Sequence, residues 1–467
     1  MEFIESTHHK RKLLREGYAY VFNKKLAGNG ESWECELRRK GAQCKVRLTV
    51  RNGVIVHQSS EHTHGSNETS NEVLRRAQAG MKRRAENTQE TTQQILTREL
   101  ANISEAAAVN LPDVQNVRRT IRMQRPHHGL PNPANRVQVP AIPPEYQLTS
   151  NGLQFLIYDS GVGDPERMLI FATAQGIDLL SISDNWFADG TFKTCPEMFY
   201  QLYTIHAMID KRTVPCIYTL LPNKQQATYT RMFTEIQNLI QGASPSDVMF
   251  DFEKAAMNAA EALFPGVEIK GCFYHLSSNI WKKIQYHGLQ AHTADQDFAV
   301  HLRMIVAVAF IPVGFVVNAF EDLATEIRRI FNNDADDVLD YFEDTYIGRP
   351  RRQGGRRNPL FHHDIWNMFQ RSRDELPRTN NHVEGWHRRL QANLDVYHPT
   401  LWKLIDVLKR EESLVRTEIA QAVGGHLAPA QRRRYADSAQ RILRIVNDYN
   451  NRPMLNYLRA IANNLQY

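Results

Sequence analysis

The sequence of 467 residues has few cysteines and no long uninterrupted apolar segment. Its most apolar stretch, residues 305–317, is interrupted by Pro312 and is too short to cross a bilayer, so we expect a buried core segment there and no membrane partner. The opening residues, MEFIESTHHKRKLLREG, contain no apolar core, and we expect no secretory signal. An odd number of scattered cysteines argues against a disulfide framework and favours a reducing compartment. The five cysteines are Cys35, Cys44, Cys195, Cys216 and Cys272.

Positive charge is concentrated in the N-terminal quarter of the chain. Residues 1–126 hold 22 Lys and Arg against 14 Asp and Glu, whereas the whole chain has a formal net charge of only +6. A module that binds a polyanion would place its charge in this way, although a basic face is often merely solvated. The segment is followed by six prolines within residues 126–144, which predict a semi-rigid linker.

Four potential zinc ligands bracket a predicted hairpin near the N-terminus. Cys35 and Cys44 are followed by His62 and His64, and two thiolates with two imidazoles suit a closed tetrahedral zinc site. The segments between them alternate as strands do, with a turn at Asn52-Gly53. So small a sheet buries too little apolar area to fold alone, and we therefore predict a structural Zn²⁺ ion. The competing interpretation is that four unrelated residues happen to fall in this order.

This segment resembles the FLYWCH zinc-finger family. The residues that carry the resemblance are Phe3, Leu14, Tyr18 or Tyr20, Trp33, Cys35, Cys44 and His62-Thr63-His64. The resemblance covers about residues 3–66 and implies sequence-specific DNA binding by a β-sheet face, although some members of the family bind protein.

Beyond the linker, apolar runs of period two predict a mixed sheet. Three strands, a helix, a strand, a helix and a further strand, extending to residue 274, follow in the order of a ribonuclease H-like fold with flanking helices. Asp189 lies within the first of these strands, and Asp251 ends the fourth. Because those strands are neighbours in this fold, we expect the two aspartates to face each other.

Two carboxylates buried side by side require a cation to neutralise them. Mg²⁺ or Mn²⁺ prefers oxygen ligands, and a pair of such ions can activate a water or a 3′-hydroxyl for attack on a phosphodiester. Glu384, on a helix that Thr379 or Asn380 could cap, is the candidate third ligand. Glu375, Asp374 and Glu343 lie in the same region and are alternatives to it.

The second half of the chain is similar to the Mutator-like element (MULE) transposases, whose DDE catalytic core is split by a helical insertion. The matching stretches are ADGTFKTCPEMFYQLYTIHA, DFEKAAMNAA, GCFYHLSSNIWKKI and RTNNHVEGWH. The resemblance implies that Asp189, Asp251 and Glu384 are the catalytic, metal-binding triad. It also places Cys272 and His275 in a Cys-x-x-His signature, on the strand after the second aspartate, as support for the active site.

Simpler interpretations exist for several of these residues. Asp189 could be a turn residue, Asp251 a helix N-cap, and Cys272 a thiol packed in the core. Tryptophans at helical spacing could stack on bases but are more often core: Trp281, Trp386 and Trp402. An arginine-rich loop in the insertion suits phosphate contacts, with a solvated loop as the alternative: Arg349, Arg351, Arg352, Arg356 and Arg357.

We therefore expect an α+β, ribonuclease H-like, metal-dependent DNA transposase of the cut-and-paste kind. Its expected partners are double-stranded DNA, at element ends and target, and further copies of itself in a dimer or larger assembly, and its expected location is the nucleus. A domesticated descendant acting as a zinc-finger transcriptional regulator, and a nuclease without strand transfer, are the alternatives. The expected organisation is a zinc finger (1–66), a basic helical segment (67–125), a Pro-rich linker (126–146), the first part of the core (147–286), a helical insertion (287–378), and a final part with the third carboxylate and C-terminal helices (379–467).

Overall fold

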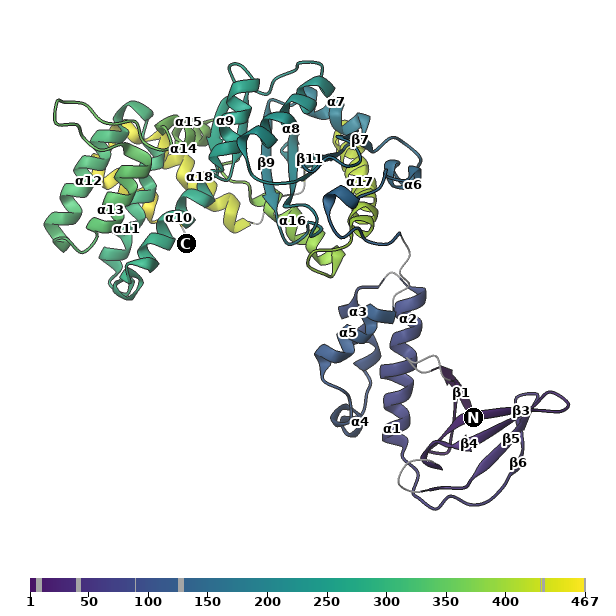
Figure 1. Ribbon diagram of the computed structural model, residues 1–467. Coiled ribbons are helices and arrows are strands. Elements are labelled where there is room, and N and C mark those ends of the chain that lie inside the picture. The colour runs from purple at the N-terminus through teal and green to yellow at the C-terminus, as the bar shows by residue number, and fades with distance from the viewer. Residues whose placement is uncertain are drawn as a thin grey trace. The chain divides into compact units, whose positions relative to one another are not determined.

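The computed structural model forms two compact units, Met1–Leu130 and Pro131–Tyr467 (Figure 1). It describes residues 1–5, 11–38, 43–88, 90–124, 130–428, 430 and 433–465. Within these residues, no helix is both long and apolar enough to span a membrane. Each unit has its own hydrophobic core and is described separately.

The first unit begins with a six-stranded antiparallel sheet in which each strand pairs with the next along the chain. One face buries Trp33 with Leu13, Tyr20 and Leu48, as expected from alternating strands. Asn52 and Gly53 both have positive φ values, 48° and 75°, and form the predicted turn of the last hairpin. The strands are β1 Glu2–Glu5, β2 Arg11–Arg15, β3 Tyr18–Leu26, β4 Gly30–Cys35, β5 Arg47–Arg51 and β6 Val54–Gln58.

A small helical bundle follows the sheet. Its apolar centre includes Met81, Ile95 and Ile121. The Ser104 hydroxyl caps a short helix, accepting a hydrogen bond from Ala107 N, and Asp113 accepts one from Gln115 N at the start of the last helix. The helices are α1 Glu68–Val73, a π-helical continuation Leu74–Gly80, α2 Met81–Asn87, α3 Thr92–Leu100, α4 Glu105–Val109 and α5 Val114–Gln124.

The predicted linker is shorter than residues 126–146. Residues 126–129 lie outside the described residues, but from Pro131 onward the chain packs onto the second unit. The Arg136 guanidinium donates hydrogen bonds to backbone carbonyls of the second unit, and Val139 and Ile142 are buried in its core. Prolines prevent a long helix here, but they do not prevent an extended segment from packing against a neighbouring surface.

The second unit is built on a seven-stranded mixed sheet of order β13-β12-β9-β10-β11-β8-β7. β9, β10 and β11 are antiparallel neighbours, while β12 runs parallel to β9 and β13 runs parallel to β12. The sequence predicted these five strands and missed β7 and β8. The strands are β7 Leu156–Asp159, β8 Leu169–Phe171, β9 Asn185–Thr191, β10 Gln201–Ile209, β11 Arg212–Leu221, β12 Asp247–Phe250 and β13 Glu268–Gly271.

Helices cover both faces of this sheet. Trp186 and Ala188 of β9 pack in one core with α8 and α9, whereas Phe187 packs on the other face with Val383 of α16. Trp386 of α16 packs with α17 against β10 and β11 residues on this second face. The helices of this part of the unit are α6 Pro144–Gln147, α7 Ala174–Ile182, α8 Gln226–Leu239, α9 Lys254–Leu263, α10 Phe273–Tyr286, α16 Asn381–Leu394 and α17 Leu401–Val423.

The predicted helical insertion forms a bundle beside the sheet, and the last helices of the chain complete it (Figure 1). Tyr457 of α19 is buried, and its hydroxyl donates a hydrogen bond to Phe310 O at the end of the first long insertion helix. The bundle shares one continuous core with the α8–α9 face of the sheet. Its helices are α11 Gln296–Ala307, α12 Val316–Phe331, α13 Asp336–Phe342, α14 His363–Trp366, α15 Phe369–Arg373, α18 Arg433–Asn447 and α19 Met454–Ala462.

Candidate functional sites

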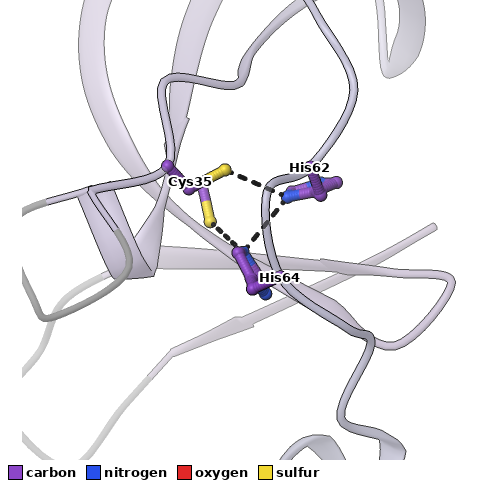
Figure 2. Close-up of side chains that lie close together, drawn as sticks. Cys35, His62 and His64 are labelled. Atoms are coloured by element: carbon purple, nitrogen blue, oxygen red, sulfur yellow. Dashed lines mark hydrogen bonds between the residues drawn. The ribbon is translucent and has the colours of Figure 1, made fainter.

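The four predicted zinc ligands lie together in the first unit. Ligand atoms of Cys35, Cys44, His62 and His64 are all within 4.8 Å of one another. Cys35 Sγ is 3.2 Å from His64 Nε2, and His62 Nδ1 is 3.3 Å from the same nitrogen (Figure 2). Tetrahedral Zn–S and Zn–N bonds place ligand atoms about 3.3 to 3.8 Å apart, so the geometry is suitable for this ion.

The surroundings of the two histidines also suit zinc. His62 directs Nδ1 to the thiols while its Nε2 is 2.8 Å from the Tyr20 hydroxyl, and His64 directs Nε2 to the thiols while its Nδ1 is 2.9 Å from Gly65 O. Such outer contacts fix the orientation of ligating imidazoles. Burial acts to raise the pKa of the Cys44 thiol, but backbone hydrogen bonds from Thr63 and Val46 outweigh it and lower the pKa to about 7. The donor set therefore supports a structural Zn²⁺ ion.

In the second unit, strand register brings Asp189 and Asp251 to the same point of the sheet. β9 and β12 pair in parallel, with Asn185 opposite Asp247 and Phe187 opposite Met249. Continuing this register by two residues sets Asp189 opposite Asp251, which directly follows β12. Alternate residues of a strand face the same side, so both carboxylates share the face on which Phe187 and Met249 meet α16.

The local chain turn holds Asp251 in a partly buried position. Phe252 has a φ of 69°, and its ring packs where a side chain on Gly271 would be, 2.4 Å from an added Cβ. Oδ1 of Asp251 is buried and accepts no hydrogen bond among the described residues. Burial, together with the negative charges of Asp189 and Glu253, raises the pKa of Asp251 to about 7. A buried carboxylate oxygen with no donor, next to a second carboxylate, suits a hard divalent cation.

Glu384 lies in the first turn of α16, above these strands. Burial, and then the charge of Asp189, raise the pKa of Glu384 above its usual value. The alternative third ligands named from the sequence have other surroundings. Glu343 pairs with Arg356 at 2.7 Å, and Asp374 and Glu375 are exposed. Among these acids, Glu384 is the one whose pKa is raised by the charge of Asp189.

The carboxylates are less tightly grouped than the zinc ligands. Within the described part of the chain, the finger provides the only group of three or more His, Cys, Asp or Glu side chains that is close enough to hold a metal ion. Like charges repel when no cation lies between them, so the three carboxylates would have to turn inward to share one.

Cys272 and His275 do not lie on a strand, contrary to the sequence prediction. β13 ends at Gly271, Cys272 precedes α10, and His275 is in the first turn of that helix. The buried Cys272 Sγ accepts a hydrogen bond from Asn380 N at 3.2 Å, so it joins the starts of α10 and α16. His275 Nε2 is 3.8 Å from Glu384 Oε1, and burial lowers the pKa of His275.

His387 is a neighbour of the carboxylates that the sequence analysis did not single out. Its Nδ1 is 3.5 Å from Asp189 Oδ2, and its Nε2 is 3.0 Å from the Thr204 hydroxyl. His387 follows Glu384 by three positions, and residues at this spacing share one face of a helix. This spacing is the feature of the sequence that could have predicted His387 as a neighbour of Glu384.

Of the other candidates, Trp386 and Trp402 are buried and Trp281 is partly buried in the core, as the simpler interpretation expected. The five arginines of the loop fall into two groups. Arg349 pairs with Asp344 and Asp340, and Arg356 with Glu321 and Glu343, so both hold the loop to the insertion. The remaining three arginines of the loop are exposed: Arg351, Arg352 and Arg357.

Together, the structure defines a finger with four clustered metal ligands, followed by a mixed sheet in which Asp189 and Asp251 lie on neighbouring strands. Comparison with known families identifies both parts: residues 3–64 match the FLYWCH zinc finger domain, and residues 185–279 match the MULE transposase domain. The first match contains all four zinc ligands; the second contains Asp189 and Asp251 but ends before Glu384. No curated protein matches the chain. The chain is therefore similar to a FLYWCH zinc finger domain in its first unit and to a MULE transposase domain in its second.

Proposed function

We propose that the second unit is a DDE-type, metal-dependent DNA transposase and that Asp189, Asp251 and Glu384 form its catalytic site. The order β11-β10-β9-β12-β13, with three antiparallel strands followed by two parallel ones, supports a ribonuclease H-like core. The observation that carries the proposal is the β9–β12 register, which sets Asp189 opposite Asp251. Mg²⁺ or Mn²⁺ bound there would supply Lewis acidity and neutralise charge at the scissile phosphate.

In the first reaction, a water oxygen forms a bond to phosphorus at the element end, and the bond from phosphorus to the 3′-oxygen breaks. The freed 3′-hydroxyl then attacks a phosphodiester of target DNA, and one phosphodiester replaces another, so no further reactant is required. His275 and His387, beside the carboxylates, are the residues placed to accept the proton of the attacking group. The finger would locate the element ends in the nucleus, and a dimer or larger assembly would pair them.

The test uses the full-length, zinc-loaded protein with DNA carrying the terminal repeats that flank its gene. With Mg²⁺ or Mn²⁺, we expect cleavage at the repeat end and joining of the 3′ end to a target plasmid. Asp189→Asn should abolish both. Asp210→Asn is the matched control, because Asp210 is exposed in a turn at a φ of 43°, which Asn also tolerates.

The alternative functions give different results in the same assay. Cleavage without joining would identify a nuclease. Sequence-specific binding of the repeats with neither reaction would identify a domesticated regulator, and would contradict the proposal.

A further inference from the structure

Three large aromatic side chains are exposed on two adjoining loops of the second unit. Phe192 and Tyr200 bound the segment between β9 and β10, with 41% and 50% of their surfaces exposed, and Tyr397, between α16 and α17, is 65% exposed. The loops are joined, because His398 N donates a hydrogen bond to Lys193 O at 2.9 Å. Exposed aromatic rings gathered in one place are a feature of binding surfaces.

Each end of this surface also carries a lysine. Lys224 Nζ is 4.6 Å from the centre of the Phe192 ring, and Lys193 Nζ is 5.4 Å from that of Tyr397. The Phe192 and Tyr200 rings meet edge to face, 5.5 Å apart. We call these five residues the aromatic–lysine patch. It combines flat aromatic rings with a lysine ammonium group over one face of Phe192 and one over a face of Tyr397.

Buried side chains and backbone hydrogen bonds support the aromatic–lysine patch. Within the same segment, Met198 and Phe199 are buried against the α16–α17 face of the sheet, and Cys195 N donates a hydrogen bond to Phe192 O. Tyr200 N donates a hydrogen bond to Leu221 O at 2.8 Å. The backbone that carries Phe192 and Tyr200 is therefore ordered before any ligand arrives, which reduces the entropy lost on binding.

The patch adjoins the carboxylates. Phe192 follows Asp189 by three residues, so their Cα atoms are at most about 11 Å apart. Lys224 Nζ is also 3.6 Å from Glu253 Oε2, two residues after Asp251. The Phe192–Lys224 end of the patch therefore lies next to the carboxylates.

We propose that the aromatic–lysine patch binds unpaired bases of the DNA strand next to the reacting phosphodiester. This inference rests on the proposed function, since it assigns the substrate form of the same site. Every base has a face that can stack on Phe or Tyr, and lysine ammonium groups contact phosphates without regard to sequence. A closed duplex hides its base faces within the stack, so the patch selects DNA that is opened or tailed at the cut.

The test compares two DNA duplexes of one arbitrary sequence, one blunt and one with a four-nucleotide unpaired tail. Binding of the full-length, zinc-loaded protein is measured by fluorescence anisotropy in buffer without chelator and without added Mg²⁺ or Mn²⁺, so that the finger keeps its zinc. The finger contacts both duplexes equally, so the ratio of the two affinities measures the contribution of the unpaired tail alone. We expect the tailed duplex, with a 3′ or a 5′ tail, to bind at least about fivefold more tightly.

The double variant Phe192→Leu/Tyr397→Leu should bring this preference below about twofold. Tyr435→Leu is the control, because Tyr435 is 61% exposed on α18 in the helical bundle. A 2-aminopurine base in the tail should lose fluorescence on binding to wild type and retain it with the double variant, which reports stacking directly. Thermal melts should show that both variants remain folded.

Equal binding of blunt and tailed duplexes by wild type would overturn the inference, as would full tail preference in the double variant. Because the assay contains no free divalent metal, it does not depend on cleavage. Absence of cleavage in the assay of the previous section would contradict the proposed function while a tail preference still stood, so the two failures are distinguishable.

Discussion

At the scale of single residues, ionisation of the Asp251 carboxyl lowers the free energy of unfolding. Its carboxyl is held among negative charges and its pKa rises from the usual 3.8 to about 7. An acid whose pKa is raised by folding keeps its proton in the folded state after the unfolded chain has lost it. The contribution of Asp251 to stability must therefore fall as the pH rises from about 4 to about 7, and change little above that.

We predict that Asp251→Asn removes this loss. In EDTA, the unfolding free energy of the second unit (residues 131–467) should decline between pH 4 and 7 in wild type, by up to about 4 kcal/mol at about 1.4 kcal/mol for each pH unit, and decline less in the variant. Urea unfolding at a series of pH values measures it. Asp210→Asn, at an exposed position, should behave as wild type. Parallel pH profiles of wild type and Asp251→Asn would contradict this assignment.

The zinc ligands give a second prediction at the residue scale. Cys44→Ser should lower zinc content from about one equivalent to none and unfold the finger, because a sheet with so small a core depends on the ion. Zinc analysis together with the NMR dispersion of residues 1–130 measures both effects.

His57→Ala is the matched control, since His57 is an exposed histidine on β6 that is not among the four clustered ligands. It should keep both zinc and fold. Retained zinc in Cys44→Ser would show that the ligand set is different.

At the scale of elements, a buried ion pair fastens the insertion to the sheet. Arg371 of α15 lies 3.0 Å from Asp247 at the start of β12, and both side chains are less than 10% exposed. Asn185 of β9 also donates a hydrogen bond to Asp247. The strand that leads to Asp251 is thus anchored at its beginning by a side chain about 120 positions away.

Arg371→Ala should destabilise the second unit by about 3 to 5 kcal/mol, because it leaves Asp247 buried without its partner. Arg373→Ala, two positions away and exposed, should change stability by no more than about 0.5 kcal/mol. Adding Asp247→Asn to Arg371→Ala should restore part of the loss. Denaturant unfolding of the three variants measures this, and an equal effect of Arg371→Ala and Arg373→Ala would exclude an energetic role for the pair.

Particular strands and loops show which features of the fold the sequence pattern could predict. Alternating apolar residues predicted β9 to β12, and the order of strands made Asp189 and Asp251 neighbours. β7 and β8 were missed because runs of four and three residues are too short to show a period, whereas β12, equally short, was expected because it stands between two predicted helices. The run around Cys272 suits a strand or a buried helix equally, and only the tertiary structure shows that β13 ends at Gly271. The ion pairs of Arg349 and Arg356 depend on acids whose positions no local pattern gives.

At the scale of the whole molecule, the proposed function assigns DNA recognition to the first unit and DNA cleavage to the second. The basic surplus of residues 1–126 lies in the first unit, and the carboxylates lie in the second. We predict that residues 131–467 bind element-end DNA much more weakly than the full chain does. The difference should shrink as salt rises, because counterion release dominates phosphate binding. Anisotropy titrations between 50 and 200 mM salt (about the range over which such contacts weaken strongly) measure it. Equal affinity of the two proteins at all salt concentrations would contradict this division.

The central claim is that Asp189, Asp251 and Glu384 share one divalent metal site. It is tested most directly by Mn²⁺ binding to the zinc-loaded full-length protein, followed by loss of the free-ion electron paramagnetic resonance signal. We predict saturable binding in wild type that is lost in Asp189→Asn and Asp251→Asn and weakened in Glu384→Gln. Glu375→Gln, an exposed acid nearby, should bind as wild type does. Undiminished Mn²⁺ binding in both aspartate variants would contradict the account.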